Sequence, residues 1–209
     1  MTTLLSLISE QTLPNVLFAK EFGEFDRYVF ISTPEMEKIE KQKTNVVVKV
    51  LGLSDNQVIR KIAQEDSLQD IQTKLQEIDF QVDEQITINL TGGNKVMGLA
   101  VFEFFKQKNN VEIFYIPFPK NQIIKIFPEQ IDKVLELQYR VSLQEYLDSY
   151  GVNVNSDSFQ TKNQVFSHAI TEGIFQKNRQ THFRLAHDFR NLWSSLRDRQ
   201  TDLALQNQG

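Results

Sequence analysis

The chain has 209 residues, 40% of them hydrophobic, and a net charge of −4. This is enough apolar surface to bury the core of one full domain and a smaller appendage. It contains no cysteine, which excludes disulfides and zinc–thiolate sites and is compatible with the cytoplasm. No apolar run approaches the roughly 20 residues that cross a bilayer, and the N-terminus lacks the basic region of a signal peptide. We therefore expect a globular, cytoplasmic protein with no membrane partner.

The charge is unevenly distributed along the chain. The acidic excess falls within residues 1–150, whereas residues 151–209 are mildly basic and hold all three histidines. These charge totals do not support general binding of nucleic acids. The change near Gly151 predicts a domain at 1–150, followed by a linker and a helical segment at 151–209.

Apolar runs of strand and helix spacing alternate through the first domain. After them, two short alternating runs predict a β-hairpin, and Ser142 begins a short helix that ends at Gly151. Repeated strand–helix units favour a mainly parallel sheet covered by helices on both faces. The expected class is therefore α/β with a Rossmann-like sheet, a hairpin and a small helical C-terminal segment. The expected elements are strands at 4–8, 27–32, 45–51, 85–90, 111–116, 122–127 and 134–140, and helices at 14–22, 34–42, 68–78, 96–106 and 142–150.

Thr91-Gly92-Gly93-Asn94-Lys95 lies between a predicted strand and a predicted helix. Glycines let backbone N–H groups approach a ligand, a helix N-terminus favours negative charge, and lysine adds a cation. The loop is therefore a candidate phosphate cradle. A Gly-Gly turn that only serves the fold is an equally good reading.

A second polar loop, Ser9 to Asn15, follows the first predicted strand. In open α/β sheets, ligands bind outside the carboxyl ends of the strands, where such loops converge. Its hydroxyl and amide groups suit a sugar or a base, although Ser, Thr and Asn are also common in N-capping turns. Neither a Walker loop nor a dinucleotide fingerprint is present, which argues against an ordinary ATPase or dehydrogenase.

The two loops and the helix after the hairpin together resemble the CARF family, the CRISPR-associated Rossmann-fold sensors of type III immunity. The resemblance covers about residues 1–150 and is nearest to the branch fused to a PD-D/ExK-type nuclease. It departs from that branch at Asn94, where threonine is expected.

The resemblance implies a homodimer that senses a cyclic oligoadenylate, with cyclic tetra-adenylate as the expected ring, bound across the two-fold axis. No other cofactor and no metal are implied for the sensor domain. The residues that the resemblance assigns to the ligand are Ser9, Gln11, Thr12, Asn15, Thr91, Gly92, Gly93, Asn94 and Lys95.

The residues after Gly151 hold no recognisable nuclease signature. The sequence therefore leaves open which effector activity the sensor would control. We expect a truncated or reduced effector region there. His182, His187 and Arg190 are candidates for a metal-free ribonuclease acting on RNA, but packing of an amphipathic helix is the stronger reading of the same residues. Whether the chain is an enzyme is therefore undecided. The alternatives to a sensor are a ring nuclease, which would convert the ring to a linear product, a tail ribonuclease, and a transcription regulator acting on DNA.

Overall fold

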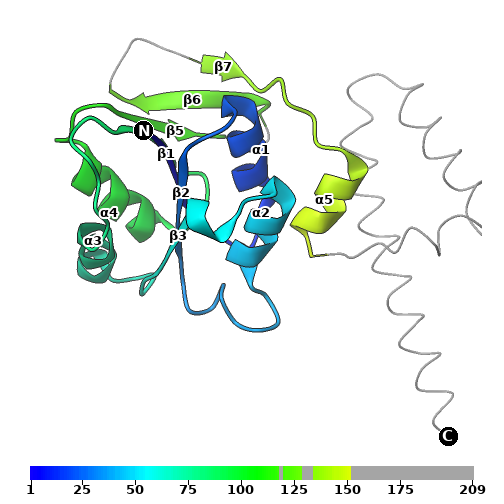
Figure 1. Ribbon diagram of the computed structural model, residues 1–209, viewed down its shortest axis with the longest axis horizontal. Helices are drawn as coiled ribbons and strands as arrows, with labels where there is room; N and C mark the ends of the chain where they lie inside the picture. The colour runs from blue at the N-terminus through cyan, green and yellow to red at the C-terminus, as the bar shows by residue number, and fades with distance from the viewer. Residues whose placement is uncertain (118–119, 129–133, 152–209) are drawn as a thin grey trace, which may run out of the picture. The chain divides into compact units, whose positions relative to one another are not determined.

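The computed structural model describes residues 1–117, 120–128 and 134–151 (Figure 1). The chain divides into two units, Met1–Val154 and Asn155–Gly209, and all described residues belong to the first. Its strands are β1 (Thr2–Leu7), β2 (Arg27–Ser32), β3 (Val58–Ile62), β4 (Gln85–Asn89), β5 (Val111–Tyr115), β6 (Gln122–Phe127) and β7 (Val134–Glu136). Its helices are α1 (Leu13–Phe22), α2 (Lys43–Leu51), α3 (Leu68–Gln76), α4 (Lys95–Phe105) and α5 (Leu143–Ser149), with a 3₁₀ turn at Asp55–Gln57.

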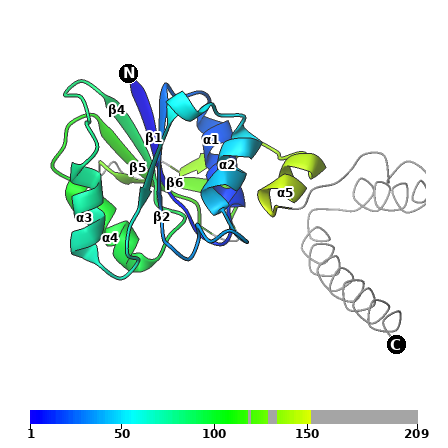
Figure 2. The ribbon, with the colours of Figure 1, turned by 60° about the horizontal axis from the view of Figure 1, so that its bottom comes forward.

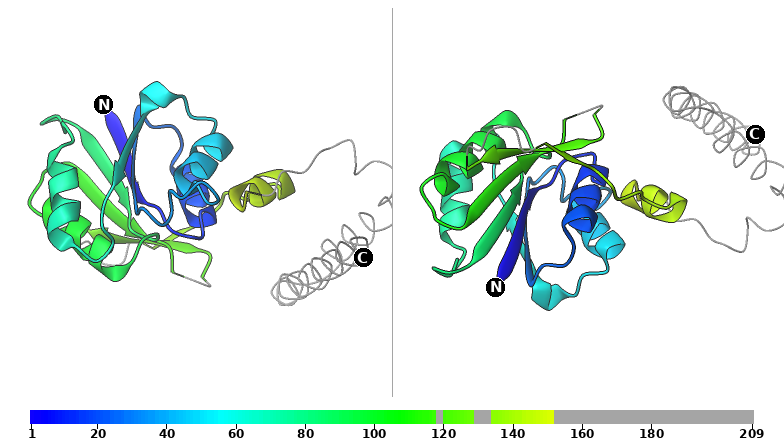
Figure 3. Two further views of the ribbon diagram at one scale, coloured as in Figure 1. Left: turned by 90° about the horizontal axis from the view of Figure 1, so that it is seen from below. Right: turned by 90° about the horizontal axis from the view of Figure 1, so that it is seen from above.

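The described strands form one seven-stranded sheet in the order β3-β2-β1-β4-β5-β6-β7. The pairs from β3 to β5 are parallel, and β6 and β7 add an antiparallel edge. Helices α1 and α2 cover one face, and α3 and α4 cover the other (Figures 2 and 3). The predicted fold class is confirmed: an α/β, Rossmann-like, mainly parallel sheet with an antiparallel hairpin at its edge.

The core consists of two apolar layers, one on each face of the sheet. Neighbouring residues of β1 point to opposite faces because side chains alternate along a strand. Leu5 and Leu7 therefore pack toward α3 and α4, whereas Leu4 packs toward α1 and α2. Burial on both faces explains why the central strands are almost continuously apolar.

The chain reverses its direction of travel across the sheet between β1 and β4. From β1 it proceeds through α1 to β2 and then β3, whereas from β4 it proceeds through α4 to β5 on the other side. The loops that leave these two adjacent strands thus diverge to opposite faces. Such a switch point creates a crevice at the carboxyl ends of the strands.

The prediction of a strand at 45–51 is wrong, because these residues lie in α2. The run Val46-Val47-Val48 has a local preference for strands. In the folded chain, however, Thr44, Val47 and Val48 are buried while Asn45 and Lys49 are exposed, which is helical spacing. Packing of this face over the sheet outweighs the local preference, and Gly52 ends the helix in the left-handed conformation at φ 68°.

Two further predictions around β2 and β3 differ from the structure. The helix expected at 34–42 is a series of turns, in which the Glu37 carboxylate accepts hydrogen bonds from Ser32 Oγ and Thr44 Oγ1. Strand β3 was missed because it is an edge strand whose charged residues, Arg60 and Lys61, interrupt the apolar pattern.

Ser67 begins α3 as the sequence predicts, with its Oγ accepting a hydrogen bond from the Asp70 N–H at 3.1 Å. We expect Ser67→Ala to lower the free energy of unfolding by about 1 kcal/mol, because one N–H of the first helical turn loses its acceptor. Urea denaturation measures this loss. Thr73→Ala, which changes an exposed residue in the same helix, is the control and should not destabilise the domain; equal losses would contradict the capping role.

Candidate functional site

The loops predicted to bind a ligand lie side by side at the switch point. Ser6 of β1 and Asn89 of β4 are register partners, so the loops that follow them begin at the same edge of the sheet. The β1–α1 loop, residues 8–12, leads to α1, and the β4–α4 loop, residues 90–94, leads to α4. The structure therefore brings the two predicted segments together.

The carbonyl of Leu7, at the end of β1, connects the two loops. Asn15 Nδ2 of α1 donates to it at 2.8 Å. Gly92 packs against it so closely that a methyl group there would lie 2.0 Å from the Leu7 oxygen. Gly93 has φ +70°, a conformation that favours glycine. Both glycines thus meet a requirement of the fold.

The β4–α4 loop is held in shape by Asn89 and Thr91. Asn89 Oδ1 accepts hydrogen bonds from the Thr91 N–H at 3.0 Å and from Thr91 Oγ1 at 2.6 Å. Thr91 Oγ1 in turn accepts from the Ile116 N–H at 2.9 Å. The Thr91 side chain is therefore engaged with the protein and fixes the start of the loop.

Asn94 and Lys95 lie at the exposed start of α4. Asn94 Oδ1 caps the helix by accepting from the Met97 N–H at 2.9 Å, and its Nδ2 donates to the Glu65 carbonyl at 3.0 Å. Lys95 is exposed, and within the described part of the chain its ammonium forms no ion pair. Lys95 thus presents a cation beside the positive end of the helix dipole.

The residues predicted in the β1–α1 segment divide into exposed and buried ones. Gln11 is exposed and Ser9 is half-buried, with its Oγ donating to the Gln11 carbonyl at 3.2 Å. Thr12 and Asn15 are buried, and Thr12 Oγ1 donates to the Ser149 carbonyl at the end of α5. Thr12 and Asn15 therefore anchor the loop to its neighbours.

Three buried polar atoms near this edge have no hydrogen-bond partner among the described residues: Ser6 Oγ, Asn15 Oδ1 and Asn89 Nδ2. Sequence reasoning missed Ser6 and Asn89. The available signal was a polar residue at an inward position of an otherwise apolar strand. Asn89 is the more informative of the two, because it also shapes the β4–α4 loop.

Two lysines contact the β1–α1 loop: Lys41, in the segment between β2 and α2, and Lys43, the first residue of α2. The carboxylate of Glu10 lies 3.0 Å from Lys41 Nζ and 3.0 Å from Lys43 Nζ. Hydrogen bonds from Lys41, and then from Lys43, lower the pKa of Glu10. The edge of the sheet is therefore not uniformly acidic, despite the negative net charge.

A model of the Card1 CARF domain matches residues 3–146, a range that includes both loops and every described strand after the first residue of β1. The chain belongs to the Card1 CARF domain family. No curated protein matches it.

Solved structures share the fold of this CARF domain. Can2 from Sulfobacillus thermosulfidooxidans, solved in complex with cyclic tetra-adenylate, superposes with a TM-score of 0.61 at 22% identity; the match covers 84% of this chain and 49% of Can2. Protein VC1899 from Vibrio cholerae gives a TM-score of 0.57 at 15% identity, covering 72% of this chain and 39% of that one. The chain thus spans half or less of the length of these proteins.

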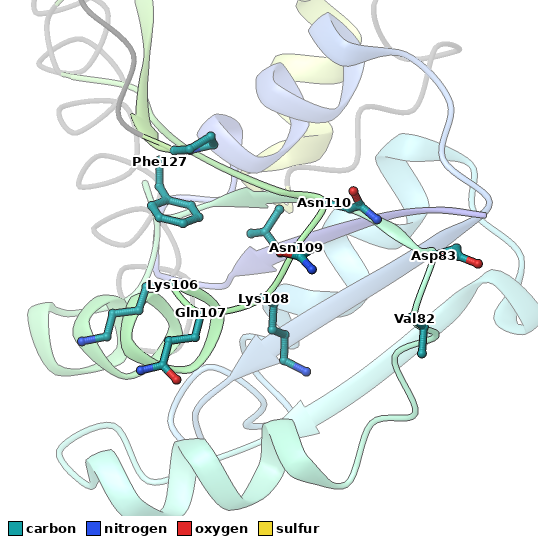
Figure 4. Close-up of a pocket in the computed structure, with 10 residues that line it drawn as sticks. Val82, Asp83, Lys106, Gln107, Lys108, Asn109, Asn110 and Phe127 are labelled. Carbon is teal, nitrogen blue, oxygen red and sulfur yellow. The ribbon is translucent and has the colours of Figure 1, made fainter.

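A cavity of about 620 Å³ lies at the amino-terminal edge of β4 and β5, away from the CARF loops (Figure 4). It is lined by Asp83 before β4 and by residues 106–110 between α4 and β5. The Lys108 ammonium lies 4.9 Å from the centre of the Phe104 ring and is thus engaged in a cation–π contact. The cavity is not part of the candidate site.

Several predictions fall outside the described residues, among them His182, His187 and Arg190. The linker and helical segment expected at 151–209 fall there too, apart from residue 151. In the part of the CARF chain that is described, His, Asp and Glu form no cluster suited to a metal ion. In the same part, no helix combines the length and the apolar character that a membrane span requires.

Proposed function

We propose that this chain is a cytoplasmic sensor of cyclic oligoadenylate in type III CRISPR antiviral defence, with cyclic tetra-adenylate as its ligand. The observation that carries the proposal is the pairing of the β1–α1 and β4–α4 loops at the switch point of a Card1 CARF domain. The complex of Can2 with cyclic tetra-adenylate supports the choice of ring.

The β4–α4 loop has the donors that a phosphodiester needs. The backbone N–H groups of Gly92 and Gly93 would donate to the phosphate, and α4 adds the positive end of its dipole. Lys95 supplies a mobile cation at the same place. We assign the phosphate of the ring to this loop.

The β1–α1 loop would contact the ribose or adenine through its exposed polar groups, Ser9 and Gln11. The buried side chains of Thr12 and Asn15 would not contact the ligand. They would position the loop through their hydrogen bonds to the carbonyls of Ser149 and Leu7. Thr91 has the corresponding role in the other loop, because its hydroxyl accepts from the backbone of residue 116.

A homodimer completes the proposed site. A ring of four identical nucleotides has two-fold symmetry, which matches an isologous dimer that presents the same patch twice. Each subunit would supply one copy of both loops, and ring binding would favour one arrangement of the dimer over another. The effector output would then follow from that rearrangement.

Lys95→Ala tests the placement of the site. We expect cyclic tetra-adenylate to bind about tenfold more weakly, because one charge-assisted contact to phosphate is lost. Isothermal titration calorimetry measures the change. Lys106→Ala removes the same charge from the other end of α4, where Lys106 pairs with the exposed Glu103, and should leave the affinity unchanged. An unaltered affinity of Lys95→Ala would overturn the placement.

A further inference from the structure

Glu10 stands in the middle of the proposed ligand loop, where a carboxylate would repel phosphate. Its Oε2 lies 3.0 Å from Lys41 Nζ and its Oε1 lies 3.0 Å from Lys43 Nζ. One anion thus bridges two cations, with one oxygen facing each. A phosphodiester also has two terminal oxygens, which share one negative charge, and would fit the same pair of lysines.

The side chains of the two lysines are largely buried, whereas the carboxylate of Glu10 is exposed. The side chain of Lys43 is 12% exposed and that of Lys41 is 27% exposed, whereas that of Glu10 is 60% exposed. Lys41 is also held by Glu35, with its Nζ 2.9 Å from Glu35 Oε1. An ion pair with a solvent-exposed partner contributes little to stability, so the Glu10 carboxylate can leave. Lys41 then keeps Glu35, and the charge of Lys43 is left for an incoming anion.

Lys41 and Lys43 lie at the edge of the sheet where the ligand is proposed to bind. They are on the side of the β1–α1 loop that faces away from Lys95. Strands β2 and β1 are parallel, with Leu7 opposite Ile31, so the segments that follow them begin at the same edge. Since β4 flanks β1 on the other side, the β1–α1 loop lies between two sources of positive charge. Lys43 is also the first residue of α2.

We propose that Lys41 and Lys43 form a second phosphate-binding position of the cyclic oligoadenylate site, which Glu10 occupies until a phosphodiester of the ring displaces it. This inference rests on the proposed function, and it adds a competing group built into the protein. Glu10 thereby weakens ligand binding in the unmodified chain. A phosphate that displaces Glu10 forms ion pairs with both Lys41 and Lys43.

A double-mutant cycle on ring binding tests this proposal. We expect Glu10→Gln to bind cyclic tetra-adenylate about fivefold more tightly, because the competing charge is gone. Lys43→Met keeps the packed aliphatic stem but removes the charge, and should weaken binding by about fivefold in the Glu10→Gln background as well. Titration calorimetry of the four proteins gives the affinities.

Glu77→Gln is the matched control, because Glu77 also bridges two lysines, Lys61 at 2.8 Å and Lys74 at 3.0 Å, away from the loops. It removes the same charge and should leave the affinity unchanged. Equal tightening by Glu10→Gln and Glu77→Gln would overturn the proposal as an effect of net charge alone.

Two other results also decide the matter. If Lys43→Met has no effect once Glu10 is replaced, the lysines only neutralise Glu10 and bind no phosphate, which overturns the proposal. If the unmodified protein binds the ring and Glu10→Gln does not bind it more tightly, this inference fails while the proposed function stands. Failure of the unmodified protein to bind the ring at all would overturn both.

Discussion

A Gly92→Ala variant is expected to lose about 3 kcal/mol of unfolding free energy and to lose detectable binding of cyclic tetra-adenylate. The added methyl group would lie 2.0 Å from the Leu7 carbonyl oxygen and 2.9 Å from its carbon. Both of these atoms belong to the backbone of a central strand, so neither can move aside without shifting β1. The loop must then withdraw from the strand end, which displaces the backbone N–H groups assigned to phosphate. Urea denaturation and calorimetric titration measure the two losses.

Gly98→Ala is the matched control, because it makes the same change six positions further along the chain, within α4. Among the described residues, no atom other than those of its chain neighbours and of the surrounding helix backbone lies within 4 Å of a methyl group at Gly98, and alanine favours helix by about 1 kcal/mol over glycine. This variant should be slightly more stable and bind the ring normally. A Gly92→Ala protein as stable as Gly98→Ala would contradict the close contact between the β4–α4 loop and β1.

The second large effect is expected at Glu84, at the opposite end of the sheet. Its side chain is fully buried and accepts hydrogen bonds from Arg27 at 2.5 Å, from the Gln81 N–H at 2.9 Å and from Thr3 Oγ1. Glu84→Ala should lower the free energy of unfolding by about 3–5 kcal/mol, because it leaves the largely buried Arg27 guanidinium without its counter-charge. Urea denaturation measures the loss.

Glu77→Ala provides the comparison for this buried pair. Glu77 meets two cations, Lys61 and Lys74, but its side chain is 42% exposed, so we expect a much smaller loss than for Glu84→Ala because solvent screens the charges. Similar losses for the two variants would show that burial does not set the strength of the Arg27–Glu84 interaction. Ring binding should be retained by Glu77→Ala, since Glu77 lies outside both loops.

The parts of the fold that could be predicted from the sequence are those in which local pattern and burial agree. The leucines of β1 are buried on both faces of the sheet, and Ser67 carries the capping chemistry that begins α3. At α2 the two disagree: three consecutive valines favour a strand locally, whereas contacts with distant segments bury Thr44, Val47 and Val48 on one face of a helix. A single sequence does not contain those contacts.

The proximity of the two candidate loops could be predicted from the sequence, but the orientation of their side chains could not. The order of strand, loop and helix was sufficient to bring residues 9–15 and 91–95 to one edge. That Thr12 faces Ser149, and Asn15 the Leu7 carbonyl, depends on packing between separate elements. The same holds for the contact of Glu10 with Lys41 and Lys43, because the predicted helix at 34–42 gave no reason to place these lysines beside the loop.

The most direct test of the central claim is a calorimetric titration of the unmodified protein with cyclic tetra-adenylate. The proposed site, completed by a second subunit across a two-fold axis, predicts saturable binding with one ring for every two chains. The linear tetra-adenylate, which lacks the closed two-fold ring, is the control and should bind more weakly. Absence of binding by the cyclic ring, or equal binding of the linear one, would contradict the account.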